Sequence, residues 1–362
     1  MEILREILNF LSKNILNVTI LLMSISFILF FTQKNRNDKK KVEDLFSLYS
    51  QKNEHEELKI RKDEQCEKSS EVCFLNGNNQ TLKLNKIIKL TNTVKIFIFS
   101  YPSKYSHFGL DICKHIKFNL PNREGKIKGK WNDKLDREND SKEIFRSYTP
   151  IYVDKKNKLV HFVIRIYNPD EKYIDGGKMS IQLNKMHNND NVKIAGPFGL
   201  LDYKGNNEFS YLSKSLKNKK HIVMIAGGTG MTPFFRLIKH LLLFDTKETE
   251  TNHPFITFIY ANRNEEEILL KPVFDEYEKR FERFKIVYSV DECIDDSKKV
   301  SMNNIGYLNV EILRMYILKY QKLNVQIEKS DTLILMCGPP PMTAFLKKLL
   351  NEDIKMENVI TV

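Results

Sequence analysis

Short apolar runs dominate the chain from about residue 81 to 205. They are rich in Ile, Val, Phe and Tyr and are separated by polar turns: Thr93–Phe99, His115–Phe118, Leu159–Tyr167 and Val192–Ile194. β-Branched and aromatic residues in short runs of this kind favour strands, and their spacing predicts a small antiparallel β-barrel. Residues 120–142 interrupt the pattern with many charges, and we expect a long exposed loop there.

A different alternation begins at about residue 219 and continues to residue 362. Buried-strand patterns at Ile222–Ile225, Phe255–Tyr260, Phe284–Val290 and Thr332–Met336 alternate with helical patterns at Thr232–Leu243, Leu270–Arg283, Asn309–Leu318 and Met342–Leu350. This order predicts a doubly wound parallel sheet, with ligands at the carboxyl ends of its strands. The predicted fold class is therefore a two-domain β plus α/β protein, with residues 206–218 as the linker between the domains.

The N-terminal pattern is different again, because Asn14–Gln33 carries no charge and is rich in Leu, Ile and Phe. As a helix, about 20 residues span roughly 30 Å, the thickness of a bilayer core. Lys34, Arg36 and Lys39–Lys41 follow at once, and the positive-inside rule then places the remainder in the cytosol. We expect residues 1–33 to be a membrane anchor with lipid contact through residues 14–33; the expected membrane is that of the endoplasmic reticulum, with the outer mitochondrial membrane as the alternative. The alternative is a buried helix of a soluble protein.

Residues 34–80 are charged, lack sustained apolar periodicity, and are expected to form a stalk. The formal net charge of the whole chain is +12, which suits an acidic partner or an anionic membrane surface. No nucleic-acid-binding motif is present. Five scattered cysteines form neither a metal-binding pair nor a disulfide framework, as is typical of a reducing compartment.

Two glycine-containing turns fall at the predicted ligand-binding edge of the parallel sheet. Ala226–Pro233 (AGGTGMTP) joins a strand to a helix, and its glycines permit positive φ values and close approach of a ligand. Thr232 is expected to cap the helix and Pro233 to be its first residue, so that the turn offers N–H groups to a dinucleotide pyrophosphate. Cys337–Met342 (CGPPPM) follows a second buried strand, Asp331–Met336.

Three further motifs lie in the barrel half: Arg146–Pro150 (RSYTP), Gly176–Ser180 (GGKMS) and Gly196–Leu201 (GPFGLL). With the two turns above, in this order, residues 82–362 resemble the cytochrome-b5 reductase family, the NADH-dependent, membrane-anchored branch of the ferredoxin–NADP reductase superfamily. The resemblance implies an oxidoreductase with FAD and NADH as cofactors. It would pass hydride from NADH to FAD and then single electrons to cytochrome b5 or a similar acidic haem protein. A monomer without a metal is expected.

The resemblance also implies a set of flavin-binding residues. Arg146 would bind phosphate oxygens with its planar fork of donors, and Tyr148 and Thr149 would lie beside the flavin. The backbone of the GGKMS segment and the Ser180 hydroxyl would hold the pyrophosphate. The full set is Arg146, Tyr148, Thr149, Pro150, Ile164, Tyr167, Gly176, Gly177, Lys178, Met179 and Ser180. For Ile164 and Tyr167, packing in the barrel core is an equal alternative.

On the nicotinamide side, the resemblance assigns the first glycine turn to the nucleotide phosphates. The cofactor-binding set is Gly227, Gly228, Thr229, Gly230, Thr232, Pro233, Glu267, Gly338, Pro339 and Met342. The expected catalytic residues are Thr149 near the flavin N5 edge, Thr232 close to the ring, and Cys337 beside the nicotinamide. The alternative for Cys337 is a buried cysteine that packs as a small apolar residue.

Coenzyme choice depends on two residues that follow the second strand of the parallel sheet. Glu267 falls where the family carries an aspartate linked to NADH preference, since a carboxylate binds a ribose 2′-hydroxyl and repels a 2′-phosphate. Arg263 could instead attract that phosphate. We favour NADH, with an NADPH-linked or other-acceptor reductase of the superfamily as the alternative.

Three departures from the family pattern stand out. The family's glycine–glutamine–histidine element corresponds here to Cys113–Lys114–His115, residues 120–142 are inserted, and the chain ends with Val362 instead of an aromatic residue. They leave open the role of His115. They also permit the hypothesis of a protein from a non-enzymatic class, a membrane scaffold with a degenerate flavin site. The intact RSYTP and GGKMS motifs disfavour this alternative.

Overall fold

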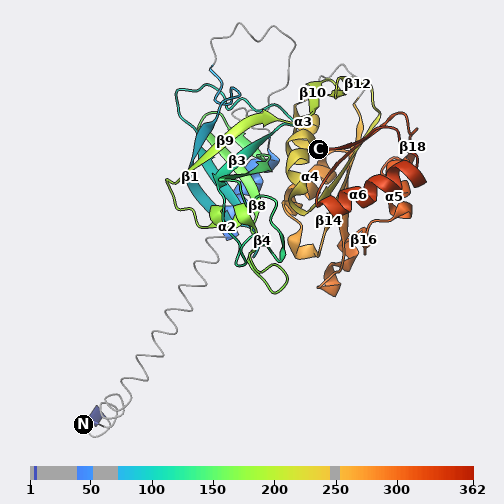
Figure 1. Ribbon diagram of the computed structural model, residues 1–362. Coiled ribbons are helices and arrows are strands. Elements are labelled where there is room, and N and C mark those ends of the chain that lie inside the picture. The colour runs from blue at the N-terminus through green and yellow to red at the C-terminus, as the bar shows by residue number, and fades with distance from the viewer. Residues whose placement is uncertain (1–3, 6–38, 52–71, 245–252) are drawn as a thin grey trace. The chain divides into compact units, whose positions relative to one another are not determined.

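The computed structural model describes residues 4–5, 39–51, 72–244 and 253–362 (Figure 1). It contains two compact units, Met1–Leu48 and Tyr49–Val362, and every feature below belongs to the second unit. The predicted anchor, residues 14–33, lies outside the described residues. Among those that are described, no helix combines the length and the apolar character needed to cross a bilayer.

A seven-stranded antiparallel sheet forms the first half of the second unit. In spatial order its strands are β6 (Glu143–Tyr148), β3 (His115–Pro121), β9 (Asn191–Phe198), β1 (Gln80–Lys89), β2 (Val94–Ser100), β8 (Leu159–Arg165) and β7 (Tyr152–Asp154). All neighbouring pairs are antiparallel. The sheet confirms the prediction that this half consists of antiparallel strands.

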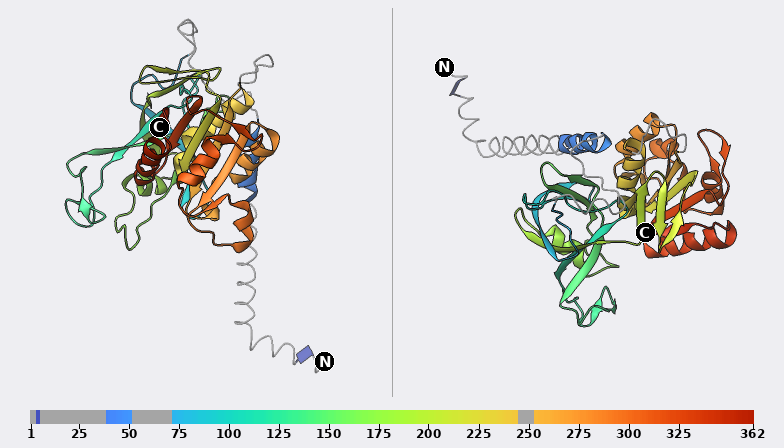
Figure 2. Two further views of the ribbon diagram at one scale, coloured as in Figure 1. Left: turned by 90° about the vertical axis from the view of Figure 1, so that its right-hand side faces the viewer. Right: turned by 90° about the horizontal axis from the view of Figure 1, so that it is seen from above.

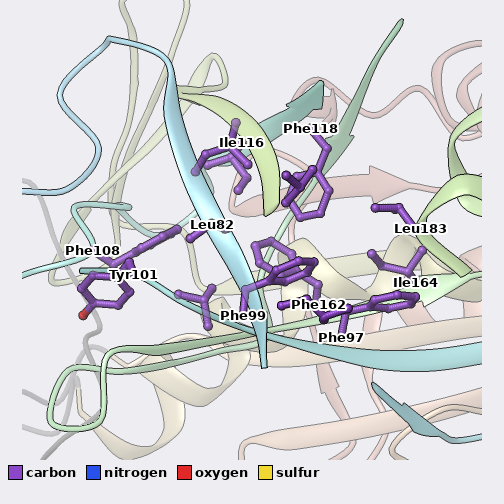
Figure 3. Packing of buried hydrophobic residues seen from close by; sticks show 14 of the residues in the cluster. Leu82, Phe97, Phe99, Tyr101, Phe108, Ile116, Phe118, Phe162, Ile164 and Leu183 are labelled. Carbon is purple, nitrogen blue, oxygen red and sulfur yellow. The ribbon is translucent and has the colours of Figure 1, made fainter. Parts of the chain in front are cut away.

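Alternate residues of these strands point into one aromatic core (Figure 3). The rings of Phe99 and Phe118 meet edge to face at 5.5 Å, and Phe162 packs against both. Leu82 and Leu84 of β1 are fully buried while Lys83 between them is exposed, the period-2 pattern of a sheet with one apolar face. Leu183 of the short helix α2 (Lys178–Asn184) closes the core at one end. The core therefore fixes the position of the GGKMS turn that begins α2.

Two segments differ from the expectations. The predicted linker at residues 206–218 instead contributes β11 (Glu208–Tyr211) and β12 (Lys214–Leu216) to a small sheet with β10 (Leu201–Gly205). The insertion at residues 120–142 is not simply an exposed loop, because it contains the hairpin β4 (Lys130–Trp131) and β5 (Lys134–Leu135). Asn132 and Asp133 form its two-residue turn with φ values of 49° and 61°, which Asn and Asp tolerate well.

A six-stranded parallel sheet forms the second half. Its order is β16 (Asn304–Ile305), β15 (Phe284–Val290), β14 (Phe255–Asn262), β13 (His221–Gly227), β19 (Thr332–Cys337) and β20 (Val359–Thr361). Helices α3 (Thr232–Leu243) and α4 (Lys271–Arg280) pack on the Phe258 face, and α5 (Val310–Ile317) and α6 (Pro340–Lys348) on the Ile259 face (Figure 2). The doubly wound parallel sheet is confirmed. A separate antiparallel hairpin of β17 (Lys319–Tyr320) and β18 (Val325–Gln326) follows α5.

Helix α3 lies between the two halves and is buried around its whole circumference. Arg236 donates to the carbonyl of Leu110 in the antiparallel half, and the Lys239 ammonium lies 5.6 Å from the ring centre of Tyr152. A helix buried all round must satisfy its polar side chains within the protein. These contacts join the domains along α3, which begins at the glycine turn.

Tyr49 also joins the two halves. Its hydroxyl lies 2.7 Å from Nδ1 of His161 in β8, its ring packs against Phe235 of α3, and its carbonyl accepts from the hydroxyl of Tyr277 in α4. The side chain is fully buried. The C-terminal end of the helical segment at residues 39–50 is therefore part of the folded core and not of a solvated stalk.

The buried histidine of β13 makes the stability of the parallel sheet depend on pH. His221 is fully buried, its Nδ1–H donates to the carbonyl of Ile317, and its Nε2 accepts from Thr257. Burial lowers the pKa of His221 from 6.5 to about 4. The unfolded chain therefore binds the proton first, and this residue's contribution to stability is present above pH 6.5 and is lost as the pH falls toward 4.

We predict that the free energy of unfolding falls by up to about 3 kcal/mol on account of His221 between pH 7 and 4. Denaturant unfolding across this range should show a flatter profile for His221→Gln than for the wild type. His187→Gln is the control, because the His187 side chain is 90% exposed. A profile for His221→Gln as steep as that of the control would contradict the assignment.

Candidate functional site

A cleft of about 1130 Å³ lies between the two sheets and is lined by both halves of the unit. The antiparallel half contributes the end of β6, the end of β8 and the start of α2. The parallel half contributes the turns that follow β13, β14 and β19, all at the carboxyl edge of the sheet. The structure thus brings together motifs that are separated by almost two hundred residues, as the resemblance implies.

Nearly all of the predicted site residues line this cleft. They are Arg146, Tyr148, Thr149, Ile164, Tyr167, Gly177, Lys178, Met179, Ser180, Gly227, Gly228, Thr229, Gly230, Thr232, Pro233, Glu267, Cys337, Gly338, Pro339 and Met342. Pro150 and Gly176 do not line it and are buried beside it. Ile164 belongs to both the core and the cleft wall, whereas Tyr167 is 57% exposed and has no place in the core.

The two turns of the parallel sheet touch through their backbones. A Cβ atom on Gly230 would lie 2.3 Å from the carbonyl oxygen of Cys337, and one on Gly227 would lie 2.6 Å from Sδ of Met342. Only Gly228 of the three glycines has a positive φ, 54°. Close packing, more than unusual backbone angles, therefore explains this glycine pattern.

The helix start differs from the prediction. Gly228–Met231 forms a short 3₁₀ turn, and α3 begins at Thr232 with Met231 as its N-cap residue. No side chain caps the helix, so the expected capping role of Thr232 is wrong, and Pro233 is the second helical residue. Thr232 is nonetheless only 8% exposed and lines the cleft.

The GGKMS turn is held against the end of β8. The amide of Gly177 donates to the carbonyl of Tyr167, and the Ser180 hydroxyl accepts from the Tyr167 amide at 3.1 Å. Gly176 has a φ of 64°, and a Cβ there would lie 2.6 Å from the Tyr167 carbonyl oxygen. Tyr148 opposite packs on Phe118 at 4.8 Å, and burial raises the pKa of its phenol, which stays protonated.

Both cations at this end of the cleft are paired with the insertion. Arg146 donates two hydrogen bonds of 2.7 Å to the carboxylate of Glu138, and Nζ of Lys178 lies 2.7 Å from Oδ2 of Asp136. The hydrogen bonds from Arg146 hold the pKa of Glu138 below its usual range. These two carboxylates were not among the predicted site residues. The signal was two acidic residues at alternate positions in an insertion between two family motifs.

At the coenzyme end, Glu267 pairs with an arginine other than Arg263. Its carboxylate forms a 2.8 Å ion pair with Arg165 of β8, so the pair links the two halves across the cleft. Arg263 is exposed and lines the cleft, as does Asp291. Burial raises the pKa of the Asp291 carboxyl above its usual value, and the charge of Arg263 offsets part of this increase. Arg165, Asn262 and Asp291 were not among the predicted site residues, although Asp291 directly follows a predicted strand and Asn262 lies two residues beyond the end of another.

Cys337 and His115 complete the cleft wall. Burial raises the pKa of the Cys337 thiol to about 11, so it is neutral at physiological pH and suited to packing or positioning and not to nucleophilic attack. The His115 pKa is lowered by burial and by Lys117 and Lys114, which favours a neutral imidazole. Cys113, at the position where a glycine is expected, has a φ of 68°, a backbone conformation that favours glycine.

Comparisons with known proteins match both halves separately. Residues 81–203 match the oxidoreductase FAD-binding domain family and residues 224–348 the oxidoreductase NAD-binding domain family. NADH-cytochrome b5 reductase 3 of Rattus norvegicus is 31% identical over 264 residues, which cover 71% of this chain and 76% of the rat protein.

Two further similarities involve nitrate reductases. The chain is 30% identical over 262 residues to nitrate reductase [NADH] 1 of Oryza sativa subsp. japonica, covering 71% of this chain and 25% of that protein. The solved cytochrome b5 reductase domain of Ulva prolifera nitrate reductase superposes with a TM-score of 0.62 at 25% identity, covering 80% of this chain and all of that domain.

The contact between the two turns can be tested with a pair of glycine variants. We predict that Gly230→Ala destabilises the protein by about 2–3 kcal/mol, because backbone must move to admit the methyl group. Gly228→Ala should cost only about 1 kcal/mol, since its cost is the positive φ and a Cβ there meets nothing closer than 3.5 Å. Thermal and denaturant unfolding measure both, and an equal or reversed order would contradict the packing argument.

Proposed function

The chain belongs to the NADH-cytochrome b5 reductase family of the ferredoxin–NADP reductase superfamily, and we propose that it is a membrane-anchored reductase that transfers electrons from NADH through FAD to cytochrome b5. That it is an oxidoreductase that uses FAD and NADH follows from its family and its two matched domains. The observation that carries the proposal is the shared cleft, which brings Tyr148 and Thr149 of one half to the same cavity as Thr232 and Cys337 of the other.

The residues of the cleft fit FAD in their chemistry. Arg146 and Lys178 supply two cations for a diphosphate, and the backbone at Gly177 lies beside them. Tyr148, Ile164 and Met179 offer an aromatic and apolar wall for a flat ring system. When bound, FAD accepts a hydride from NADH and can release the two electrons one at a time.

The protein's own contribution is orientation. Thr149 and Thr232 line the cleft from opposite halves, and the neutral thiol of Cys337 lines it at the end of β19 without adding charge. The buried helix α3 and the Arg165–Glu267 ion pair hold the halves together. Fixed approach of two reactants raises their effective concentration greatly, which is the advantage such a rigid cleft provides.

The acceptor and the membrane belong to the proposal and rest on sequence. The net charge of +12 suits an acidic haem protein, and relatives with high coverage are named cytochrome b5 reductases. The uncharged stretch at residues 14–33 would anchor the chain and leave the catalytic part in the cytosol, at the endoplasmic reticulum or the outer mitochondrial membrane. Confinement to one membrane would raise the encounter rate with a membrane-bound partner.

Electron transfer to cytochrome b5 tests the proposal. The FAD-loaded protein, supplied with NADH and excess oxidised cytochrome b5, should reduce the haem over many turnovers, as followed by its visible spectrum. Reduction of the bound flavin without reduction of the haem would keep the reductase and remove cytochrome b5 as its acceptor. Flotation of the full chain with lipid vesicles tests the anchor separately.

Coenzyme preference provides a further prediction. Glu267→Gln should raise the rate with NADPH relative to NADH about tenfold, or ~1.4 kcal/mol, because the variant loses a carboxylate and leaves Arg165 free to attract a 2′-phosphate. The double variant Arg165→Gln/Glu267→Gln should lose most of this gain. Glu266→Gln, at an exposed neighbouring position, is the control. Steady-state kinetics with both coenzymes measure the ratios, and no change in Glu267→Gln would remove this residue from coenzyme selection.

A further inference from the structure

Residues 122–142, the part of the insertion that lies between β3 and β6, fold back onto the GGKMS turn. The buried Asp175 carboxylate accepts the amides of Lys126 and Asn132, at 2.7 and 2.6 Å. Asn132 returns a hydrogen bond by accepting the Asp175 amide, and the Trp131 indole donates to the carbonyl of Gly176. The insertion is therefore docked by its own backbone against the turn that precedes α2.

This docking places two carboxylates at the cations of the flavin site. The Lys178 and Asp136 side chains are only 3% and 7% exposed, and their charged atoms are 2.7 Å apart. Glu138 lies between the two cations, because it binds Arg146 at 2.7 Å and lies 3.7 Å from Nζ of Lys178. The Trp131 ring covers Lys178 at 5.0 Å. Two anions thus meet two cations in an arrangement that a diphosphate would also satisfy.

We propose that Asp136 and Glu138 set the affinity for FAD by competing, within the chain, with the FAD diphosphate for Lys178 and Arg146. The inference rests on the proposed role of these two cations as phosphate ligands. A buried ammonium without a counter-ion is costly, so Lys178 needs an anion whether or not the cofactor is bound. Binding of FAD then exchanges one set of ion pairs for another, and the loss of the first set subtracts from the gain of the second.

The competition has a consequence for the protein without its cofactor. The carboxylates neutralise the two cations and, with the contacts of Asp175, hold the GGKMS turn in its folded position. Asp136 and Glu138 therefore stabilise the apo-protein and weaken FAD binding at the same time. A role in which the carboxylates merely support the bound cofactor predicts the opposite sign for their effect on FAD affinity.

Three ligands separate these possibilities. FAD and ADP both carry a diphosphate, whereas riboflavin carries the flavin ring without phosphate. Their dissociation constants for apo-protein are measured by calorimetry, with flavin fluorescence as a second measurement for FAD and riboflavin. The variant is Asp136→Asn/Glu138→Gln. The control is Asp133→Asn/Asp140→Asn, which removes the same formal charge at two exposed positions of the insertion.

We expect the Asp136→Asn/Glu138→Gln variant to bind FAD and ADP about tenfold more tightly than the wild type, a change of ~1.4 kcal/mol, and riboflavin with unchanged affinity. Its apo form should melt at a lower temperature. The control should match the wild type in all respects. Should the double variant not fold, Glu138→Gln alone gives the same comparison, because Glu138 is 35% exposed and tolerates the change best.

Unchanged or weaker binding of FAD by the variant would overturn the inference, and so would equal tightening for riboflavin, which would indicate general opening of the cleft. These results leave the proposed function intact as long as the wild-type chain binds FAD. Failure of the wild-type chain to bind FAD, with ADP binding tightened in the variant, would instead remove the proposed function and keep the competition for phosphate.

Discussion

The cleft depends on the contact between two backbone turns at the carboxyl edge of the parallel sheet. Strands β13 and β19 pair in register, with Ala226 opposite Cys337, so the turns that follow them must pass within van der Waals distance. Only glycine at positions 227 and 230 leaves room for this approach. The same contact directs the start of α3 toward the antiparallel half and places Cys337 on the cleft wall. A side chain in this seam would separate the turns and displace the residues on both sides.

The position of α3 explains how the two halves that form the cleft keep a fixed position relative to each other. A helix that is buried all round has no solvated face along which it could slide, and two of its polar side chains, Arg236 and Lys239, contact Leu110 and Tyr152 of the other half. Tyr49 and the Arg165–Glu267 pair add contacts at separate points of the same boundary. The relative position of the halves is thus determined by packing and by directional polar contacts. Hydride transfer between two bound cofactors requires such a fixed relative position.

The sequence predicts those parts of the structure that depend on local periodicity. The strands at β13, β14, β15 and β19 and the helix at Thr232–Leu243 agree with the expected ranges closely, because continuous apolar runs mark strands buried on both faces and the apolar residues of the helix recur at helical spacing. The motifs indicate where the cleft lies, since nearly all of the residues they imply line it. The partners of Arg146 and Lys178 could not be found in this way. Their carboxylates come from an insertion whose fold depends on hydrogen bonds between Asp175 and residues more than forty positions away. Likewise, the sheet at residues 206–218 and the burial of Tyr49 reflect tertiary packing that no local pattern records.

Anaerobic titration of the FAD-loaded protein with NADH measures whether this cleft brings a bound flavin and NADH together for electron transfer. One equivalent of NADH should bleach the visible absorbance of one equivalent of bound flavin, and the wild type should prefer NADH to NADPH in this reaction. If the protein binds FAD but keeps its absorbance on addition of either coenzyme, the cleft does not join the two cofactors.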